Sequence, residues 1–294
     1  MEHIDKSKYR KEFDAYTLCY LHDAKMQDGC FYPKLESKES FGAFSENKYK
    51  NTSVPVGTQF DGWLSLLLHE QNGRCCYCMR KLKPNEISVE HLVPESFNGL
   101  DENEEYRFYA GLTEEIRDYV VTGSMFDQMA MESMINLEQL KRMPHLIAHS
   151  NLFPACSVNS LGCSCNNHRG NHRILPMMLM GETEKWLDYS TDGELRIFFH
   201  DVDISRSTLR YLDINCKTLR EIRHLWFLFS RKQLHPENEN LSIREKDSLL
   251  RTVLDLDAEI VIPLDYQKYL LKPTYWNLLL QYDWFFFYYL HKQQ

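Results

Sequence analysis

The stretch Val89-Glu90-His91-Leu92-Val93-Pro94 places an acid directly before a histidine in an apolar segment. Residues 87–93 first alternate apolar and polar side chains, which predicts a strand that ends at Pro94, where the backbone donor is lost. A carboxylate can bind a hard cation, and a histidine of near-neutral pKa can accept a proton from water. Neighbouring side chains of a strand point to opposite faces, so a twist or bulge near Pro94 must bring Glu90 and His91 to one site.

Cysteines flank this stretch on both sides. Six of the nine form two tight groups, at positions 75, 76, 78 and at positions 156, 163, 165. Cys75 and Cys78 form a C-x2-C pair, whose spacing lets two thiolates share one tetrahedral ion. Cys156 and Cys165 are the preferred other ligands, with Cys163 as an alternative to either. Because four thiolates leave no open position for water, the ion is expected to be a structural zinc.

The other cysteines are expected to have no metal role. Cys76 lies inside the first turn, so its side chain should point away from the ion. Cys19, Cys30 and Cys216 are isolated in the sequence, and each is expected to be a small buried apolar side chain.

Downstream, the chain offers further polar candidates. Asn151 precedes the second cysteine group, and the run Cys165-Asn166-Asn167-His168-Arg169-Gly170 begins with a predicted zinc ligand. Each has a plain alternative: Asn151 as a turn residue, and Arg169 as a cap at a helix end rather than a phosphate contact. An isolated Glu-His pair would likewise be an exposed acid beside a packed histidine. His145, His149 and His172 lie nearby and are expected to be packed or at the surface.

The order of these motifs resembles the HNH, or ββα-metal, nucleases. The resemblance implies that Glu90 and Asn166 hold a divalent cation, Mg²⁺ or Mn²⁺, and that His91 activates water for attack on a phosphodiester. It also implies that Asn151 orients the loop and the histidine without touching the cation. In an alternative alignment on the run before Gly170, His168 replaces Asn166 as the ligand, and Arg169 is the candidate substrate contact.

Within this group, the chain most resembles the PtuB-type nucleases of Septu and retron anti-phage defence systems. Three pieces carry the likeness: 73–82, 89–97 and 151–176. The resemblance implies cleavage of nucleic acid, DNA in preference to RNA. It also implies an ATPase partner of the PtuA type, with a retron reverse transcriptase and its RNA–DNA as a further candidate. Two departures are the six residues between Cys156 and Cys163, where the family has C-x2-C, and a long insert before Asn151.

A rival interpretation from another class is a zinc-stabilised adaptor or nucleic-acid-binding protein without catalysis. It needs the cysteines but has no need of Glu90, His91 and Asn166 together. The net charge of −8 argues against a general nucleic-acid binder. A local basic patch or a partner is therefore expected to supply the grip on substrate.

Composition sets the frame for the fold. Hydrophobic residues make up 43% and charged residues 26% of the 294 residues, as in folded soluble proteins. No apolar stretch reaches the roughly 18 residues of a membrane span, and the start lacks the apolar core of a signal peptide. We therefore expect a cytoplasmic protein without a membrane partner.

The expected fold is α+β, with a small zinc-stabilised ββα-metal core embedded in a mainly α-helical chain. The predicted regions are an N-terminal region (1–57), the nuclease core (58–180) with a helical insert (about 100–143), and a mainly helical C-terminal domain (181–294). Apolar periodicity and chain breaks predict helices at 59–71, 112–122, 124–142, 216–233, 241–255 and 274–291, and strands at 87–93, 145–152 and 195–199. The last helix is aromatic on most faces, so it is either core, the preferred interpretation, or a partner-docking surface involving Tyr282 and Tyr289.

Overall fold

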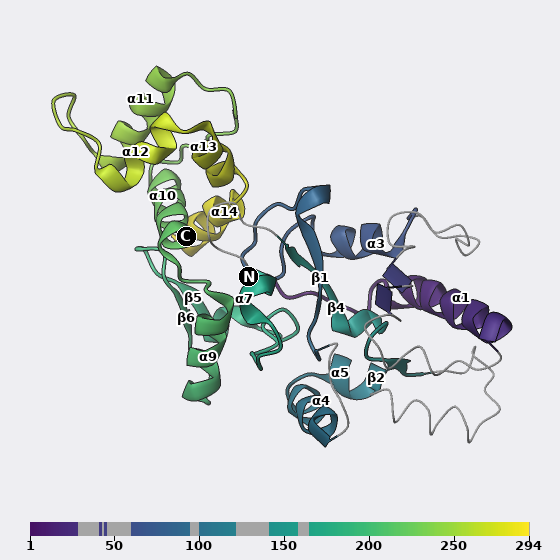
Figure 1. Ribbon diagram of the computed structural model, residues 1–294. Helices are drawn as coiled ribbons and strands as arrows, with labels where there is room; N and C mark the ends of the chain where they lie inside the picture. The colour runs from purple at the N-terminus through teal and green to yellow at the C-terminus, as the bar shows by residue number, and fades with distance from the viewer. Residues whose placement is uncertain are drawn as a thin grey trace.

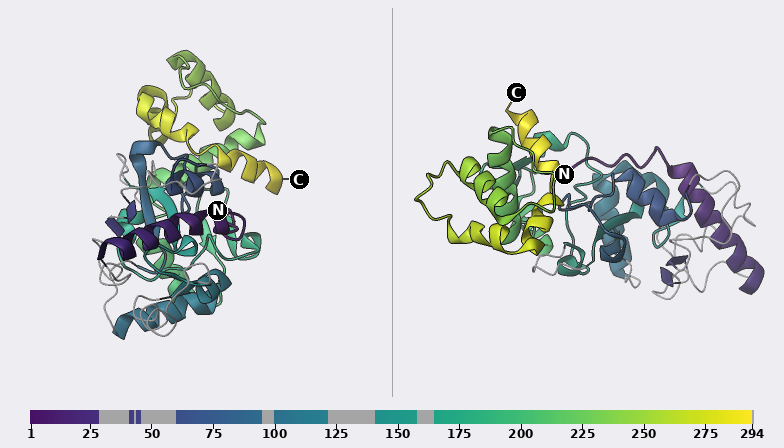
Figure 2. Two further views of the ribbon diagram at one scale, coloured as in Figure 1. Left: turned by 90° about the vertical axis from the view of Figure 1, so that its right-hand side faces the viewer. Right: turned by 90° about the horizontal axis from the view of Figure 1, so that it is seen from above.

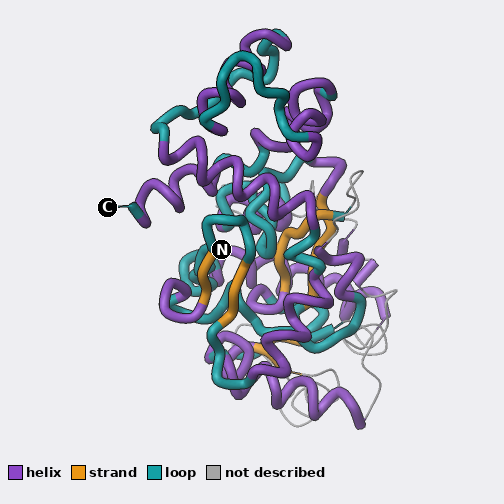
Figure 3. The backbone as a smooth tube through the Cα atoms, turned by 90° about the vertical axis from the view of Figure 1, so that its left-hand side faces the viewer, coloured by secondary structure: helices purple, strands orange, loops and turns teal. Residues whose placement is uncertain are grey.

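The computed structural model describes residues 1–28, 41–42, 44–45, 60–94, 100–121, 141–157 and 165–293. Over these ranges the protein is α+β, as expected, with helices around short paired strands. The C-terminal helices lie at one end of an elongated molecule and α1 (Arg10–Asp28) lies at the other (Figures 1 and 2). The short strands lie between the two ends (Figure 3). None of the described helices is long and apolar enough to cross a membrane.

A two-stranded antiparallel hairpin occupies the centre. Strand β1 (Ile87–His91) pairs with β4 (Leu152–Cys156), with His91 opposite Leu152 at one end and Ile87 opposite Cys156 at the other. Two smaller pairs are β2 (Val120–Val121) with β3 (Met143–Pro144), and β5 (Leu187–Tyr189) with β6 (Leu195–Ile197).

Helices and turns connect these strands in the first part of the chain. They are α3 (Trp63–Glu70), η1 (Pro84–Glu86), α4 (Leu100–Leu112), α5 (Glu114–Tyr119), η3 (His149–Asn151) and α7 (Cys165–Arg169). The predicted helix at 59–71 is observed as α3. The helix ends at Glu70, and the turn after it is closed by Gly73, whose φ of +66° suits glycine and whose N–H bonds to Leu68 O at 2.7 Å. This turn delivers the chain to Cys75.

The two faces of the hairpin pack against different hydrophobic clusters. Ile87 and Val89 pack on a cluster built from α1, α3 and Leu152. Phe153 and Ala155 belong to a second cluster, which contains the four cysteines of the predicted zinc site and continues into the C-terminal helices. Alternation along β1 and β4 therefore separates an α1–α3 face from an α7 face.

The C-terminal part is mainly helical, as expected. Its helices are α8 (Thr183–Trp186), α9 (Val202–Leu212), α10 (Lys217–Arg231), α11 (Ile243–Leu254), α12 (Leu264–Leu271), α13 (Pro273–Leu280) and α14 (Trp284–Lys292). The apolar stripe predicted for α10 is buried in full (Leu219, Ile222, Leu225, Trp226 and Phe229). Ser242 and Glu245 form a capping box that starts α11.

The aromatic segment near the C-terminus differs from expectation. The predicted helix at 274–291 is two helices, α13 and α14, separated by residues 281–283. Tyr282 and Tyr289 are both buried rather than outward-facing. These two tyrosines therefore pack in the core, as the preferred interpretation expects, and docking of a partner by other parts of the segment stays a prediction.

The predicted returning strand at 145–152 is also wrong. This segment forms a turn followed by η3, and the strand begins only at Leu152. The Asn151 side chain bonds to the backbone of His145 and Val93, and so holds the segment folded rather than extended. The predicted helix at 124–142 lies almost wholly outside the described residues.

Candidate metal centre and active site

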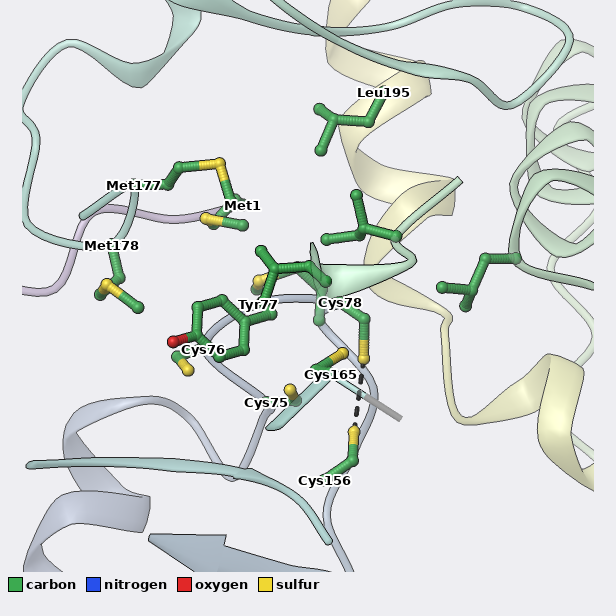
Figure 4. Packing of buried hydrophobic residues seen from close by; sticks show 14 of the residues in the cluster. Met1, Cys75, Cys76, Tyr77, Cys78, Cys156, Cys165, Met177, Met178 and Leu195 are labelled. Atoms are coloured by element: carbon green, nitrogen blue, oxygen red, sulfur yellow. Dashed lines mark hydrogen bonds between the residues drawn. The ribbon is translucent and has the colours of Figure 1, made fainter. Parts of the chain in front are cut away.

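Four cysteines come together at one point, as their spacing predicts. The sulfur atoms of Cys75, Cys78, Cys156 and Cys165 all lie within 4.8 Å of one another, and all four residues are buried (Figure 4). With Zn–S bonds of about 2.3 Å, sulfur atoms at the corners of a tetrahedron stand roughly 3.8 Å apart. The sulfur atoms of Cys78 and Cys156 are 3.4 Å apart. The four side chains therefore fit one tetrahedral ion such as zinc.

Three separate parts of the fold supply these thiols. Cys75 and Cys78 stand in a tight turn after α3, in which Cys75 N–H donates to Arg80 O and Met79 N–H to Cys75 O. Cys156 is the last residue of β4, and Cys165 is the first residue of α7. A bound ion would therefore tie the turn, the hairpin and the helix together.

The cluster favours one deprotonated thiol even without an ion. Burial alone would raise the pKa of the Cys75 thiol, but hydrogen bonds from Cys156, Cys165 and the other cysteines lower it well below its usual value. The pKa of Cys165 is raised well above its usual value, first through its hydrogen bond with Cys156. A metal ion would stabilise all four thiolates in the way that neighbouring thiols stabilise one.

The remaining cysteines divide into three cases. Cys76 is buried and does not join the four-sulfur group, although its thiol hydrogen-bonds to Cys75 (Figure 4). Cys19 and Cys216 are only half-buried, and Cys216 is disulfide-bonded, so the expectation of a small buried apolar side chain is wrong for both. Cys30 and Cys163 lie outside the described residues, so the alternative with Cys163 as a ligand stays open.

Glu90 is buried on the face of the hairpin that α7 covers. Its carboxylate forms an ion pair with the guanidinium of Arg169, the last residue of α7, and both side chains are almost fully buried. This contact spans 79 positions of the sequence. It places the predicted cation-binding acid between β1 and the helix that begins at Cys165.

Arg169 holds several segments to this point. It donates to the backbone oxygens of His91 at 2.8 Å, Leu92 at 2.5 Å and His172 at 3.2 Å. It also bonds the hydroxyls of Tyr109 at 3.1 Å and Tyr77 at 3.4 Å. Because these partners surround a guanidinium with no exposed surface, they favour a bracing role over the predicted phosphate contact.

Asn151 has the loop-holding arrangement that the resemblance implies. Its Oδ1 accepts from Val93 N–H at 2.6 Å, and its Nδ2 donates to Val93 O at 2.9 Å and to His145 O at 2.7 Å. All three bonds are buried, and they fix the residues that directly follow β1. Both hydrogens of Nδ2 and one lone pair of Oδ1 are thus engaged with the backbone.

His91 points to the opposite face of the hairpin from Glu90. Its Nε2 lies 3.0 Å from Leu146 O, and its ring packs edge-on against Phe41 at 4.4 Å between centroids. A carbonyl oxygen only accepts, so Nε2 carries the proton in the neutral ring. Burial lowers the pKa of His91 to about 4, although the bond to Leu146 opposes this. The ring is therefore neutral at pH 7.

The regular pairing of β1 continues through His91, without the bulge that would turn both side chains to one side. The expected convergence of Glu90 and His91 is therefore not observed.

Of the two candidates for the second cation ligand, His168 is half-exposed and its Nε2 lies 3.9 Å from a carboxylate oxygen of Asp213 at the end of α9. Asn166 lies in α7, and its side chain is outside the described residues.

Two buried histidines add to the α1–α3 face. His145 has neither ring nitrogen in a hydrogen bond, and burial followed by the nearby His91 lowers its pKa to about 3. His149 stacks on Phe13, and its Nε2 lies 3.2 Å from a Glu70 oxygen, without hydrogen-bond geometry. The sequence predicted packed or surface positions for these residues, and the apolar neighbours at 146–148 were the available signal of burial.

Glu70 belongs to a buried charged group that the sequence did not indicate. Lys6 Nζ donates to Glu70 at 2.6 Å and to Leu152 O at 3.0 Å, with both charged side chains almost fully buried. Burial opposes ionisation, but the charge of Lys6 lowers the pKa of Glu70 to about 2. The pair ties the N-terminal segment to β4.

Comparison with known proteins gives no further guidance. No protein-family model matches the chain, and no curated protein or solved structure matches it.

Proposed function

We propose that the protein is a metal-dependent HNH-type endonuclease that hydrolyses phosphodiester bonds of nucleic acid. The observation that carries the proposal is the position of Glu90. The acid lies between β1 and α7, and α7 begins at the cysteine Cys165 and continues with Asn166. The chain order of strand, strand and helix supports the same proposal, as does the Asn151 amide that fixes the residues after β1.

In this proposal the four cysteines hold a structural zinc, which would fix the start of α7 against the hairpin. Glu90 and Asn166, or His168 in the alternative, would hold Mg²⁺ or Mn²⁺. Such an ion supplies Lewis-acid stabilisation of charge on a phosphoryl oxygen. Glu90 would have to exchange Arg169 for this cation or share its two oxygens between them.

His91 is the proposed general base, and Leu146 O orients its ring through Nε2–H. For this role, the backbone at residues 91–93 has to turn so that the imidazole reaches the α7 face. Both Glu90 and His91 are buried among the described residues, so substrate reaches them only when covering residues move. Arg169 would hold the carbonyl oxygens of residues 91 and 92 in place during that movement.

The proposed setting is an anti-phage defence complex, in which an ATPase partner of the PtuA type recruits or licenses the substrate. It follows from the sequence resemblance alone. The negative net charge supports a partner that supplies part of the substrate grip.

A zinc-stabilised adaptor without catalysis is the second candidate. It is favoured by the complete pairing of Glu90 with Arg169 and by the separation of Glu90 and His91 on opposite faces. Purified protein should be incubated with labelled DNA and RNA in Mg²⁺ or Mn²⁺, with and without an ATPase partner. Cleavage that EDTA abolishes supports the nuclease, whereas retention of labelled nucleic acid without cleavage under every condition supports the adaptor.

A further inference from the structure

The break between α13 and α14 rests directly on the cysteine turn. Lys81 N–H donates to Gln281 O at 2.8 Å, and Arg80 Nε donates to Gln281 Oε1 at 2.6 Å. Asp283 accepts from Arg74 at 2.9 Å and from Lys81 at 2.6 Å. Residues 281–283, hereafter the C-terminal junction, therefore contact the turn that carries Cys75 and Cys78 through both backbone and side chains.

Tyr282 stands in the middle of the junction. Its hydroxyl donates to Cys78 Sγ at 3.6 Å, and both side chains are buried with 1% exposure. A phenol at neutral pH is a donor, and a thiolate is an acceptor with charge to disperse. The contact is thus directed at a predicted metal ligand and comes from a residue 204 positions away in the sequence.

This hydrogen bond would offset part of the negative charge of a metal-loaded site. Four thiolates and one Zn²⁺ carry a net charge of −2, which is costly in a buried place unless nearby donors offset it. Among the described residues, the Tyr282 hydroxyl donates to Cys78, and the charge of the nearly buried Arg80 guanidinium interacts with Cys78 and Cys156. Arg80 is itself held by Glu86 at 2.6 Å and by Gln281.

The junction is also fixed on its other side. Tyr282 N–H donates to Leu279 O at 3.0 Å, and the same oxygen accepts from Trp226 Nε1 of α10 at 3.0 Å. A shift of Tyr282 would therefore disturb the packing of α13 against α10. Conversely, correct packing of these helices sets the direction of the phenol.

We propose that Tyr282 is a positioning residue of the four-cysteine site, so that metal affinity and packing of the C-terminal helices depend on each other. The inference rests on the zinc site of the proposed function. It gives the C-terminal region a role beyond that of a separate domain, because a change that loosens the packing of α13 and α14 also lowers the metal affinity of the site. Groups that bond to metal ligands typically change affinity by about 10- to 100-fold when removed.

The test compares Tyr282→Phe with Tyr289→Phe. Tyr289 is buried in the same aromatic segment, but its hydroxyl donates to Ser190 O at 2.9 Å and contacts no cysteine. Each variant loses one hydroxyl. Zinc affinity is measured by competition with a chromophoric chelator, and the thiolate-to-metal charge-transfer band is recorded after loading with Co²⁺.

Tyr282→Phe should weaken zinc binding by about 10-fold or more and shift the cobalt band, whereas Tyr289→Phe should leave both at their wild-type values. Equal affinities and spectra in the wild type and Tyr282→Phe would overturn the inference while leaving the zinc site intact. A wild-type chain that takes up neither zinc nor cobalt would remove the zinc site as well.

Asp283→Asn provides a second variant in case Tyr282→Phe does not fold. It weakens the ion pairs of the junction with Arg74 and Lys81, and the Asp283 side chain is partly exposed. A smaller but measurable loss of zinc affinity is expected. Wild-type affinity in this variant would show that the junction does not support the metal site.

Discussion

The two faces of the central hairpin differ in how many partners their buried polar side chains have. On the α7 face, Glu90 and Arg169 are paired, and the guanidinium also bonds five further oxygen atoms. On the α1–α3 face, the ring nitrogens of His145 and His149 are buried without hydrogen bonds. Buried polar groups without partners are rare and costly. The comparison indicates that the α7 face is a brace, whereas the α1–α3 face combines the paired Lys6 and Glu70 with imidazole nitrogens that have no hydrogen bond.

The largest loss of stability is expected when the α7 face loses the metal that would join the hairpin to α7. Cys78→Ser is expected to give insoluble or heat-labile protein, because binding of a structural zinc contributes on the order of 10 kcal/mol to folding. Thermal unfolding and metal content are the measurements, with about one zinc per chain expected in the wild type.

Cys76→Ser is the matched control for this prediction. Cys76 is two residues away and equally buried, but it lies outside the four-sulfur group. It should retain full zinc content with only a modest loss of stability. A stable, zinc-free wild type would contradict the account of the site.

The next largest loss of stability is expected when the ion pair of Glu90 with Arg169 is removed. Arg169→Met should destabilise the fold by about 3–5 kcal/mol, because it leaves the buried charge of Glu90 without its partner. Arg173→Met is the control, since that arginine pairs with Glu104 and Glu105 nearer the surface, where ion pairs contribute about 1 kcal/mol or less. Urea unfolding of both variants measures the difference. Equal losses would show that the α7 face is not specially braced.

The smallest effect concerns acid stability and the α1–α3 face. The pKa values of His145 and His149 are lowered by burial from 6.5 to about 3 and about 4. The unfolded chain therefore binds more protons than the folded chain as pH falls below about 6.5, and stability is lost from there towards pH 4. Each unit of pKa shift corresponds to about 1.4 kcal/mol.

His145→Leu should reduce this loss by removing one titrating group. Urea unfolding at pH 7.5 and pH 5 measures the slope in the variant and in the wild type. The neighbouring substitution Leu146→Val should lower stability by the same amount at both pH values. An unchanged slope in His145→Leu would mean that the buried imidazole does not titrate as inferred.

The spacing of residues in the sequence was sufficient to predict the cysteine site and the first strand of the hairpin. The C-x2-C spacing predicted Cys75 and Cys78 as ligands, and the second cysteine group supplied Cys156 and Cys165 as their preferred partners. Asn151 was also predictable, because an asparagine side chain can replace backbone partners in a turn. These are local properties that a short window of sequence contains.

The rest depends on partners that are distant in sequence. The ion pair of Glu90 with Arg169 and the bond from Tyr282 to Cys78 join residues that no local pattern relates. The predicted helix at 274–291 breaks where Gln281 O accepts from Lys81 N–H and the local backbone bonds of residues 282 and 283 tighten to an i→i+3 pattern. Helix α1 escaped prediction because its segment combines apolar and charged residues without a clear stripe.

The central claim is that His91 serves as the general base of a nuclease although it lies on the α1–α3 face. The most direct test is the single-turnover rate of cleavage of labelled DNA by His91→Ala in Mg²⁺ or Mn²⁺, with zinc content measured in parallel. His224→Ala is the control, because His224 also bonds a backbone carbonyl, Thr191 O at 2.7 Å, but belongs to α10. The account predicts a loss of about 10²–10⁴-fold for His91→Ala, with wild-type zinc content and a wild-type rate for His224→Ala. Undiminished cleavage by folded, zinc-loaded His91→Ala would contradict it.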